Sequence, residues 1–127
     1  MNKKLNIDLV VVGPEAPLVA GLSDRLSEEE IPCFGPNSIG AKLEGSKLYA
    51  KEIMQSTKVP TAGLILIENI NRINESLDTY SPPWVVKRDV LAGGKGVVVT
   101  SDRNEAFNAL SNGIKLDGKV LLEEFLF

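Results

Sequence analysis

The most constraining feature of this 127-residue chain is the stretch at residues 84–100, WVVKRDVLAGGKGVVVT. An apolar run ends at Lys87, and a second, β-branched run follows at residues 97–99. The segment between them is rich in glycine and carries one lysine, with Gly93, Gly94, Lys95 and Gly96. Two such runs bounded by glycines predict two strands joined by a flexible loop. Loop N–H groups and a lysine can face an anion together, which suits a lid over a polyphosphate, although a solvated hairpin fits the same residues.

Two common nucleotide-binding motifs do not fit this stretch. A Walker loop needs a longer spacing and a Ser or Thr after its lysine, whereas Gly96 and Val97 follow Lys95 here. The dinucleotide fingerprint needs a helix at its last glycine, where this sequence predicts another strand. Support for a phosphate site must therefore come from the rest of the chain.

The composition limits the chemistry that this chain can perform. It has no histidine, which excludes Ser–His–Asp and Cys–His catalytic sets and zinc sites with histidine ligands within these residues. Lysine, arginine, carboxylates and backbone amides remain, and they suit phosphate chemistry, which depends on charge neutralisation and positioning. The single Cys33 cannot form a disulfide within the chain, favours a reducing, cytoplasmic compartment and is expected to be a buried small hydrophobe.

Charge and hydropathy argue against two classes of partner. The net charge is −3 and the isoelectric point is about 5.0, so we expect neither nucleic-acid binding nor adsorption to a membrane surface. The longest apolar run is too short to span a bilayer, and no signal peptide is expected.

The first third of the sequence predicts a βαβ unit. The run IDLVVV at residues 7–12 reads as a buried parallel strand, and leucines then recur at helical spacing up to Glu30. Residues 31–34 form the second expected strand. Ligands of such units usually bind beyond the carboxyl ends of the strands, where Glu15 lies. The preferred explanation of Glu15 is a turn carboxylate that is favourable near a helix N-terminus.

Two helices are expected next, over residues 39–43 and 47–56. Asn37 or Ser38 can cap the first, and Ser46 the second. Lys47 and Lys51 are four residues apart and share one face of the second helix, although lysines on a helix are usually solvated. Tyr49, Ile53 and Met54 are expected to pack on another face, and the break at residues 59–61 reads as a linker.

The remainder predicts an α+β arrangement around the glycine-rich loop. A strand is expected over residues 62–67, a helix over 69–77 and a turn over 81–83. After the two strands of residues 84–100, Asp102 and Glu105 begin a helix that is expected to end at Asn112 and Gly113. KVLLE at residues 119–123 is the last strand.

Taken together, the segments VVVGPEAPLVAGL, FGP, KLEGSKLYAKEIM, VPTAG, PWVVKRDVLAGGKGVVV and VLLEEFL resemble phosphoribosylamine–glycine ligase, also called glycinamide ribonucleotide synthetase, of the ATP-grasp superfamily. The resemblance covers nearly the whole chain. It implies an α/β fold with the end of a parallel βαβ (pre-ATP-grasp) domain at residues 1–43, a linker helix at 44–60 and a partial α+β ATP-grasp lid subdomain at 61–127.

The resemblance also implies a reaction. ATP phosphorylates glycine to glycyl phosphate, and the amine of 5-phosphoribosylamine then displaces phosphate to give glycinamide ribonucleotide in purine biosynthesis. ATP and Mg²⁺ or Mn²⁺ are the implied cofactors. The alternatives are another ATP-grasp carboxylate–amine ligase and a non-catalytic nucleotide-binding fragment, and the oligomeric state stays open.

Site residues follow from the resemblance by position. Lys47 and Lys87 resemble the phosphate-contacting lysines of the superfamily, and the glycine-rich segment resembles the lid over the β- and γ-phosphates. Glu123, Glu124 and Leu126 resemble the hinge that receives adenine, largely through backbone groups. Glu15 lies in the part that the family uses around phosphoribosylamine.

Three substitutions relative to the family pattern affect the lid. The family more often has KADGLAAGKG or KASGLAAGKG, whereas this chain has Arg88 for the small residue, Val90 for the first glycine and Gly93 for an alanine. A positive φ at Val90 would cost about 1–2 kcal/mol, and Gly93 would loosen the lid.

Family members also contain segments that this chain lacks. They have an earlier glycine-rich loop with Arg, Glu and His, and a later glutamate and asparagine that hold Mg²⁺. We therefore expect an internal fragment that does not catalyse the reaction alone, with its metal ligands beyond residue 127.

Overall fold

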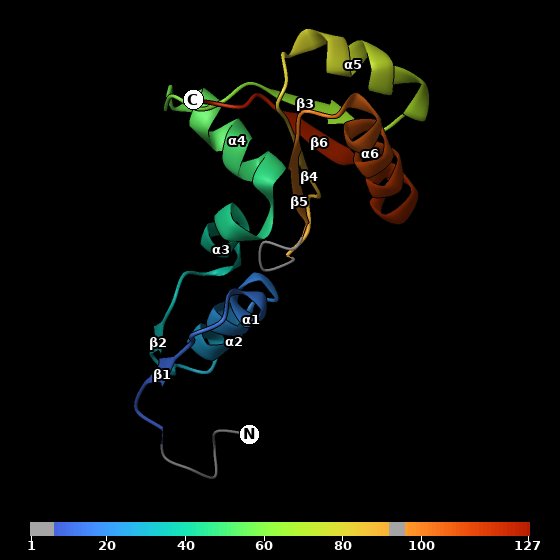
Figure 1. Ribbon diagram of the computed structural model, residues 1–127. Coiled ribbons are helices and arrows are strands. Elements are labelled where there is room, and N and C mark those ends of the chain that lie inside the picture. The colour runs from blue at the N-terminus through green and yellow to red at the C-terminus, as the bar shows by residue number, and fades with distance from the viewer. Residues whose placement is uncertain (1–6, 92–95) are drawn as a thin grey trace. The chain divides into compact units, whose positions relative to one another are not determined.

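The computed structural model describes residues 7–91 and 96–127. The chain forms two compact units, Met1–Ser46 and Lys47–Phe127, whose elements are labelled in chain order in Figure 1. The α/β fold class predicted from the sequence is confirmed, because a parallel sheet and an antiparallel sheet are both present. No helix within the described ranges is long and apolar enough to cross a lipid bilayer.

The first unit is the predicted βαβ arrangement followed by one more helix. Strands β1 (Val10–Val11) and β2 (Cys33–Phe34) pair in parallel. The expectation of a single helix between these strands is wrong. Gly21 adopts a left-handed conformation with φ of 84° and separates α1 (Glu15–Val19) from α2 (Leu22–Glu28). A left-handed residue ends one helix, and the chain restarts the next in a new direction.

Helix α3 (Ser38–Gly45) begins as predicted, because the Asn37 side chain accepts a 2.8 Å hydrogen bond from the Gly40 N–H. The expectation that Cys33 is buried is wrong. It is only half-buried, since it lines a cavity of about 340 Å³ together with Ser23 and Ser27.

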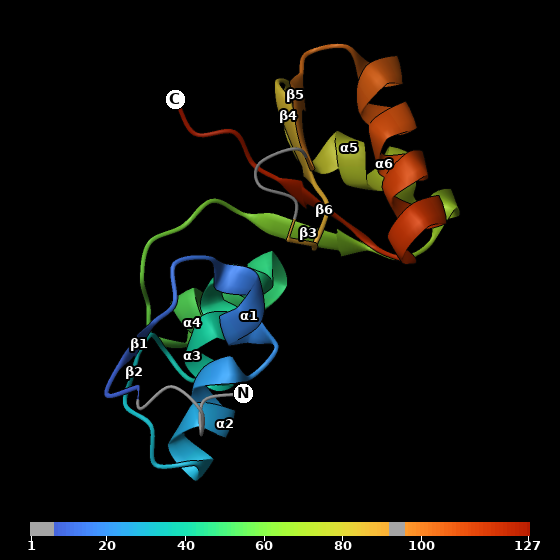
Figure 2. The ribbon, with the colours of Figure 1, turned by 90° about the horizontal axis from the view of Figure 1, so that it is seen from below.

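The second unit contains a four-stranded antiparallel sheet in the order β3-β6-β4-β5. Its strands are β3 (Leu64–Ile67), β4 (Trp84–Lys87), β5 (Val97–Thr100) and β6 (Val120–Glu123). The other elements are helix α4 (Lys47–Ser56), the 3₁₀ turn η2 (Ile70–Arg72), and helices α5 (Ile73–Thr79) and α6 (Arg103–Asp117). Figures 1 and 2 show α5 and α6 against one face of this sheet.

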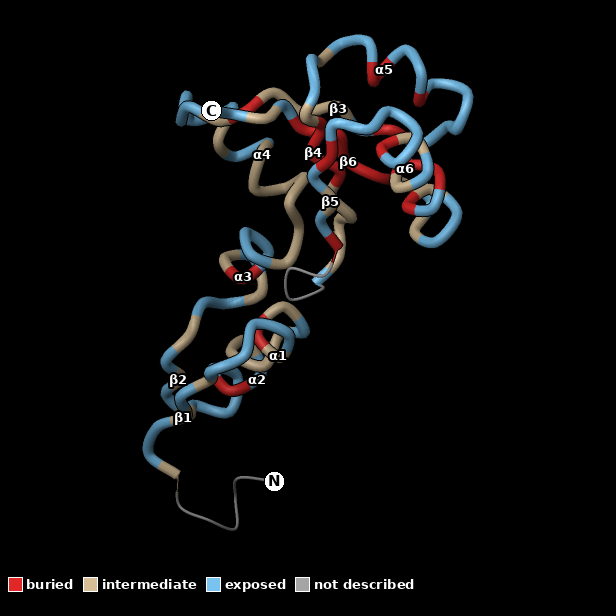
Figure 3. The backbone as a smooth tube through the Cα atoms, viewed as in Figure 1, coloured by how far each residue is buried: buried red, intermediate tan, exposed pale blue. Residues whose placement is uncertain are grey.

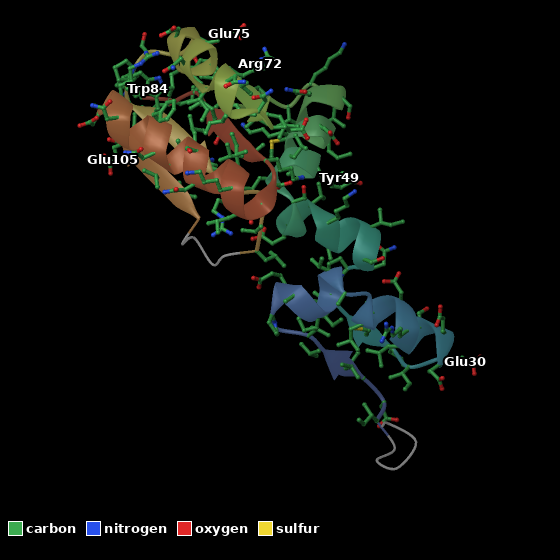
Figure 4. All side chains as sticks on the ribbon, turned by 90° about the vertical axis from the view of Figure 1, so that its right-hand side faces the viewer. Glu30, Tyr49, Arg72, Glu75, Trp84 and Glu105 are labelled. Atoms are coloured by element: carbon green, nitrogen blue, oxygen red, sulfur yellow. The ribbon has the colours of Figure 1, made fainter. Side chains whose placement is uncertain are left out.

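The main hydrophobic core lies between that face and the two helices, and the red segments of Figure 3 follow it through β3, β4, β6 and α6. Its buried members are Ile67, Ile73, Leu77, Trp84, Val86, Ala106, Leu110, Val120 and Leu122. The Trp84 indole N–H donates to the carbonyl oxygens of Leu77 at 3.0 Å and Tyr80 at 2.9 Å, beside the end of α5 (Figure 4). A buried indole that keeps its hydrogen bonds adds apolar area without leaving an unpaired polar group.

Helix α4 begins and ends where the sequence predicts, but the expected packing of Ile53 is wrong. Ile53 is 38% exposed, and α4 contributes no buried residue. Lys47 and Leu48 donate hydrogen bonds to Val90 and Asp89, which follow β4, and Lys51 forms an ion pair with Glu123 of β6. The helix is therefore joined to the sheet largely through its charged and backbone groups.

The predicted end of α6 is also wrong. The helix continues through Asn112 and Gly113 to Asp117, and the true C-terminal cap is Gly118 with φ of 75°. Gly113 is buried against β6, where a Cβ atom would lie 2.7 Å from Val120 Cγ2. The glycine permits close helix–strand packing, and the sequence pattern alone made it resemble a helix stop.

Replacing Gly113 with alanine is therefore expected to destabilise the chain by about 1–3 kcal/mol, because the added methyl overpacks against Val120. Helix propensity alone would give the opposite sign, a gain of about 1 kcal/mol. Urea unfolding of Gly113→Ala and of Asn112→Ala, an exposed neighbour in the same helix, separates the two effects. A more stable Gly113→Ala variant would contradict the close-packing interpretation.

Candidate nucleotide-phosphate site

The second face of the sheet carries the charged side chains. Side chains alternate between the faces of a strand, so Val86 and Leu122 enter the core while Lys87 and Glu123 project from the opposite face. On this face Lys87 lies opposite Leu121 of β6 and Val97 of β5 in the strand register. The end of β4 thus places a lysine on the side of the sheet away from α5 and α6.

Glu123 is the centre of a three-residue ionic cluster. One carboxylate oxygen, Oε1, forms an ion pair with Lys51 Nζ, and the other, Oε2, forms one with Lys87 Nζ. Glu123 is only 6% exposed. Burial by itself raises the pKa of Glu123, but the hydrogen bonds from Lys51 and Lys87 outweigh it and hold the pKa below its ordinary value. The carboxylate is therefore ionised and shared between two ammonium groups.

Lys47, the first residue of α4, contacts the start of the connection between β4 and β5. Its ammonium donates to the Val90 carbonyl at 3.1 Å. The adjacent Leu48 N–H donates to Asp89 Oδ1 at 3.2 Å, and Lys119 Nζ lies 2.9 Å from Asp89 Oδ2. Asp89 thereby occupies the N-terminus of α4, and its hydrogen bond raises the pKa of Lys119. The first turn of α4 is joined directly to the residues that follow β4.

Lys47 and Lys87 thus have different partners, Val90 and Glu123. Three cavities of the described residues are lined by other side chains. The convergence of Lys47 and Lys87 on a single triphosphate stays a prediction.

Of the glycine-rich segment, Gly93, Gly94 and Lys95 lie outside the described residues. Gly96 is buried, and its carbonyl accepts a 2.9 Å hydrogen bond from the Arg88 N–H. This bond extends the β4–β5 pairing by one step and closes the stem of the loop.

The two described departures from the family pattern have structural explanations. Among the described non-glycine residues only Glu30 and Lys58 have positive φ, so Val90 carries none of the strain that a left-handed backbone would impose. Arg88 forms a bidentate pair with Asp117 at the end of α6, at 2.6 and 2.9 Å. That pair raises the pKa of Arg88 and lowers the pKa of Asp117 through the shared hydrogen bonds.

The residues after β6 form a second connection to the start of β3. The Glu124 N–H donates to the Gly63 carbonyl at 2.9 Å, and the Gly63 N–H donates to Glu124 Oε2 at 3.0 Å. Glu124 and Leu126, which is 63% exposed, line a cavity of about 390 Å³ together with Tyr80. Burial, followed by the charges of Glu124 and Glu123, raises the pKa of Tyr80. The backbone N–H of Glu124 is therefore already used within the protein.

Glu15 is exposed and begins α1 in the first unit, as expected from either of its two interpretations. No group of three or more Cys, Asp or Glu side chains that could hold a metal ion occurs in the part of the chain that the structure describes. The candidate site in the described part of the chain is therefore characterised by its lysine side chains.

Sequence reasoning missed the roles of Lys51 and Asp89. The spacing of four from Lys47 placed Lys51 on a shared helix face, but a solvated lysine fitted that pattern equally well. The partner Glu123 comes from β6, far along the sequence. Asp89 carried no signal of its own, since Leu48 and Lys119, two of the residues that contact it, lie far from it in the sequence.

Comparison with known proteins identifies the relatives of both units. Residues 45–127 match the family described as phosphoribosylglycinamide synthetase, ATP-grasp (A) domain, and residues 1–44 match its N domain. The phosphoribosylamine–glycine ligase of Streptomyces coelicolor is 49% identical over 123 residues, which are 97% of this chain and 29% of that protein. The same-named protein of Leifsonia xyli is 48% identical over 119 residues, 94% of this chain and 28% of that protein.

Solved structures agree with the sequence matches. The crystal structure of phosphoribosylamine–glycine ligase from Thermotoga maritima superposes with a TM-score of 0.74 and 29% identity, covering 98% of this chain and 32% of that one. D-alanyl-alanine synthetase A from Vibrio cholerae, at 17% identity and a TM-score of 0.79 over 95% of this chain and 38% of that one, shares the fold. The chain spans about 30% of the length of these curated relatives. With more than half of its residues matched by the ATP-grasp domain and the rest by the N domain, the chain belongs to the phosphoribosylglycinamide synthetase family.

Proposed function

We propose that this chain supplies part of the ATP-phosphate site of a phosphoribosylamine–glycine ligase. In the proposed reaction a carboxylate oxygen of glycine attacks the γ-phosphorus of ATP, and the bond to the ADP oxygen breaks. The amine nitrogen of 5-phosphoribosylamine then attacks the carbonyl carbon of glycyl phosphate, inorganic phosphate leaves, and the nitrogen loses a proton. The product is glycinamide ribonucleotide. The matched relatives, which carry the name of this ligase, support the choice of substrates.

The observation that carries the proposal is the placement of Lys87. Its side chain is 29% exposed on the face of the sheet opposite α5 and α6, and Glu123 is its ion-pair partner. An ammonium group has three N–H donors, and among the described residues Glu123 is the ion-pair partner of Lys87, so we propose phosphate oxygens as acceptors for the other donors. Phosphoryl transfer is promoted mainly by neutralising and positioning charge, which is the chemistry that lysine offers. We assign Lys87 to the nucleotide phosphates for this reason.

The other proposed ligands follow the family pattern. Lys47 would reach the phosphates by exchanging its hydrogen bond to the Val90 carbonyl, 3.1 Å away, for one to a phosphate oxygen. Gly93, Gly94, Lys95 and Gly96 would cover the β- and γ-phosphates. Glu123, Glu124 and Leu126 would border adenine, and Glu15 would belong to the phosphoribosylamine side.

A divalent cation, Mg²⁺ or Mn²⁺, would neutralise further phosphate charge. No group of three or more Cys, Asp or Glu side chains that could hold a metal ion occurs among the described residues, and the family pattern would place the metal ligands beyond residue 127. We propose a cytoplasmic protein with ATP, glycine and 5-phosphoribosylamine as its small-molecule partners.

Titration of the isotope-labelled chain with ATP, followed by NMR, tests the phosphate site. Lys87→Met is expected to weaken ATP binding about tenfold or more, because a charge-assisted hydrogen bond is lost. Lys115→Met, which removes the same charge from an exposed position on α6, is the matched control and should bind ATP like the unmodified chain. Equal affinities of the Lys87 and Lys115 variants, or no binding by the unmodified chain, would refute the proposed site.

A further inference from the structure

Lys51 is held entirely by the protein. Its ammonium pairs with Glu123 Oε1 and donates to Thr61 Oγ1 and to the Ala62 carbonyl, the latter at 2.9 Å. These three acceptors match the three donors of an ammonium group. The side chain is 12% exposed, so Lys51 has no free donor to offer to a ligand.

The two carboxylate oxygens of Glu123 pair with two lysines that differ in exposure and in their other partners. Lys51 uses Oε1 and is saturated, whereas Lys87 uses Oε2 and is more than twice as exposed, at 29% against 12%. The cluster of two lysines and one ionised carboxylate carries a net charge of about +1. If Lys51 were absent, Glu123 would pair with Lys87 alone and cancel its charge.

We propose that Lys51 is a positioning residue for the nucleotide phosphates, acting through Glu123 on Lys87. This proposal rests on the proposed function, because Lys87 is the group that would contact phosphate. Lys51 occupies one carboxylate oxygen and fixes the Glu123 side chain, so that the partly exposed Lys87 keeps a defined place and an uncancelled positive charge. Thr61 and Ala62, which precede β3, hold Lys51 in turn.

Among the described residues, Tyr80 also lies close enough to Glu123 to respond to its charge, and Glu124 follows Glu123 in the chain. Neither is a cation, so neither can replace Lys51 as a partner of the carboxylate. Lys47, on the same helix, is directed to the Val90 carbonyl instead. Within the described residues, Lys51 and Lys87 are the cations paired with Glu123.

A thermodynamic cycle in this chain tests the inference, with ATP and adenosine as probes in NMR titrations. Lys51→Met is expected to weaken ATP binding about tenfold and to leave adenosine binding unchanged. In a Glu123→Gln background the same change should cost at most about a third as much, because there is no carboxylate left to cancel Lys87. Equal losses in both backgrounds would identify Lys51 as an independent contributor of charge and overturn the inference. Equal losses for ATP and adenosine would assign it a merely structural role and also overturn it.

Two further variants keep the test decisive. Lys51→Arg retains a cation beside Glu123 and should keep ATP affinity within about threefold of the unmodified chain. A tenfold loss of ATP affinity in a folded Lys51→Arg variant would overturn the inference. This test also applies where Lys51→Met does not fold. Lys115→Met again controls for the loss of one exposed positive charge.

The outcome separates this inference from the proposed function. If the unmodified chain binds no ATP, both fail. If it binds ATP and Lys51→Met binds equally well, only the role of Lys51 fails. The NMR titration of the Glu123 carboxyl group gives a readout that needs no nucleotide. Its midpoint is expected to rise in Lys51→Met because one of the two stabilising ammonium groups is gone. An unchanged midpoint would overturn the Lys51–Glu123 contact itself.

Discussion

Replacing Leu110 with alanine is expected to lower the free energy of unfolding by about 2–5 kcal/mol. Leu110 is fully buried, with 0% exposure, in the core between α6 and the sheet. The substitution removes apolar contacts and leaves a cavity that the surrounding strands and helices can close only partly. Because domains of this size are stable by about 5–15 kcal/mol in total, the loss should be visible as a large shift of the urea midpoint.

Leu116→Ala is the matched control for this prediction. Leu116 belongs to the same helix but is 69% exposed, so its replacement should change stability by no more than about 0.5 kcal/mol. The two variants share helix propensity and side-chain chemistry and differ in burial. Similar unfolding midpoints for both would show that the core is not formed as described.

The second large effect is expected at Glu123, where Glu123→Gln should destabilise the chain by about 3 kcal/mol near neutral pH. The change leaves Lys51 and Lys87, of which Lys51 is 12% exposed, without their carboxylate. Breaking a buried ion pair on one side is costly because the remaining charge stays desolvated. Denaturant unfolding at neutral pH measures the difference.

The pH dependence of that difference has a defined sign. The pKa of Glu123 is lower in the folded chain than its ordinary value of 4.5, so its contribution to stability is complete above that value and is lost as the pH falls through the folded pKa. The stability gap between the unmodified chain and Glu123→Gln should therefore narrow on acidification. A gap that stays constant between neutral pH and pH values below about 4 would contradict a depressed pKa.

Glu75→Ala provides the control at a surface pair. Glu75 Oε2 lies 3.5 Å from Arg72 Nε, with both side chains mostly exposed at 72% and 66%; both residues are labelled in Figure 4. Exposed pairs contribute at most about 1 kcal/mol. Glu75→Ala should therefore change the free energy of unfolding little at any pH, in contrast to Glu123→Gln.

Local features of this fold could be predicted from the sequence. The cap at Asn37 depends on an amide three residues away, and the strands on either side of the glycine-rich segment depend on β-branched runs. Signals of this kind are contained in a few neighbouring residues, so one sequence suffices to read them. The start of α6 at Asp102 is a further example, since Asp102 accepts from the Asn104 and Glu105 N–H groups at 2.7 and 3.2 Å.

Features set by distant residues could not be predicted. Gly113 looked like a helix stop because the reason for a glycine there is Val120 on the neighbouring strand. Gly21 was read as part of a continuous helix, since the leucine spacing carries no record of a left-handed backbone. In the candidate site, the likeness to the family pointed to Lys87 and Glu123, but only the folded chain shows that Lys51 is the second partner of Glu123.

The anchoring of α4 has a consequence for where this protein can be shortened. A version starting at Thr61 would begin just ahead of β3, yet it would deprive Asp89 of the Leu48 amide and Glu123 of the Lys51 ammonium. Each of these two almost fully buried carboxylates would then have lost one partner, a hydrogen-bond donor for Asp89 and an ion-pair partner for Glu123. The smallest piece able to fold by itself should consequently include the helix that opens with Lys47, even though that helix donates no side chain to the apolar interior.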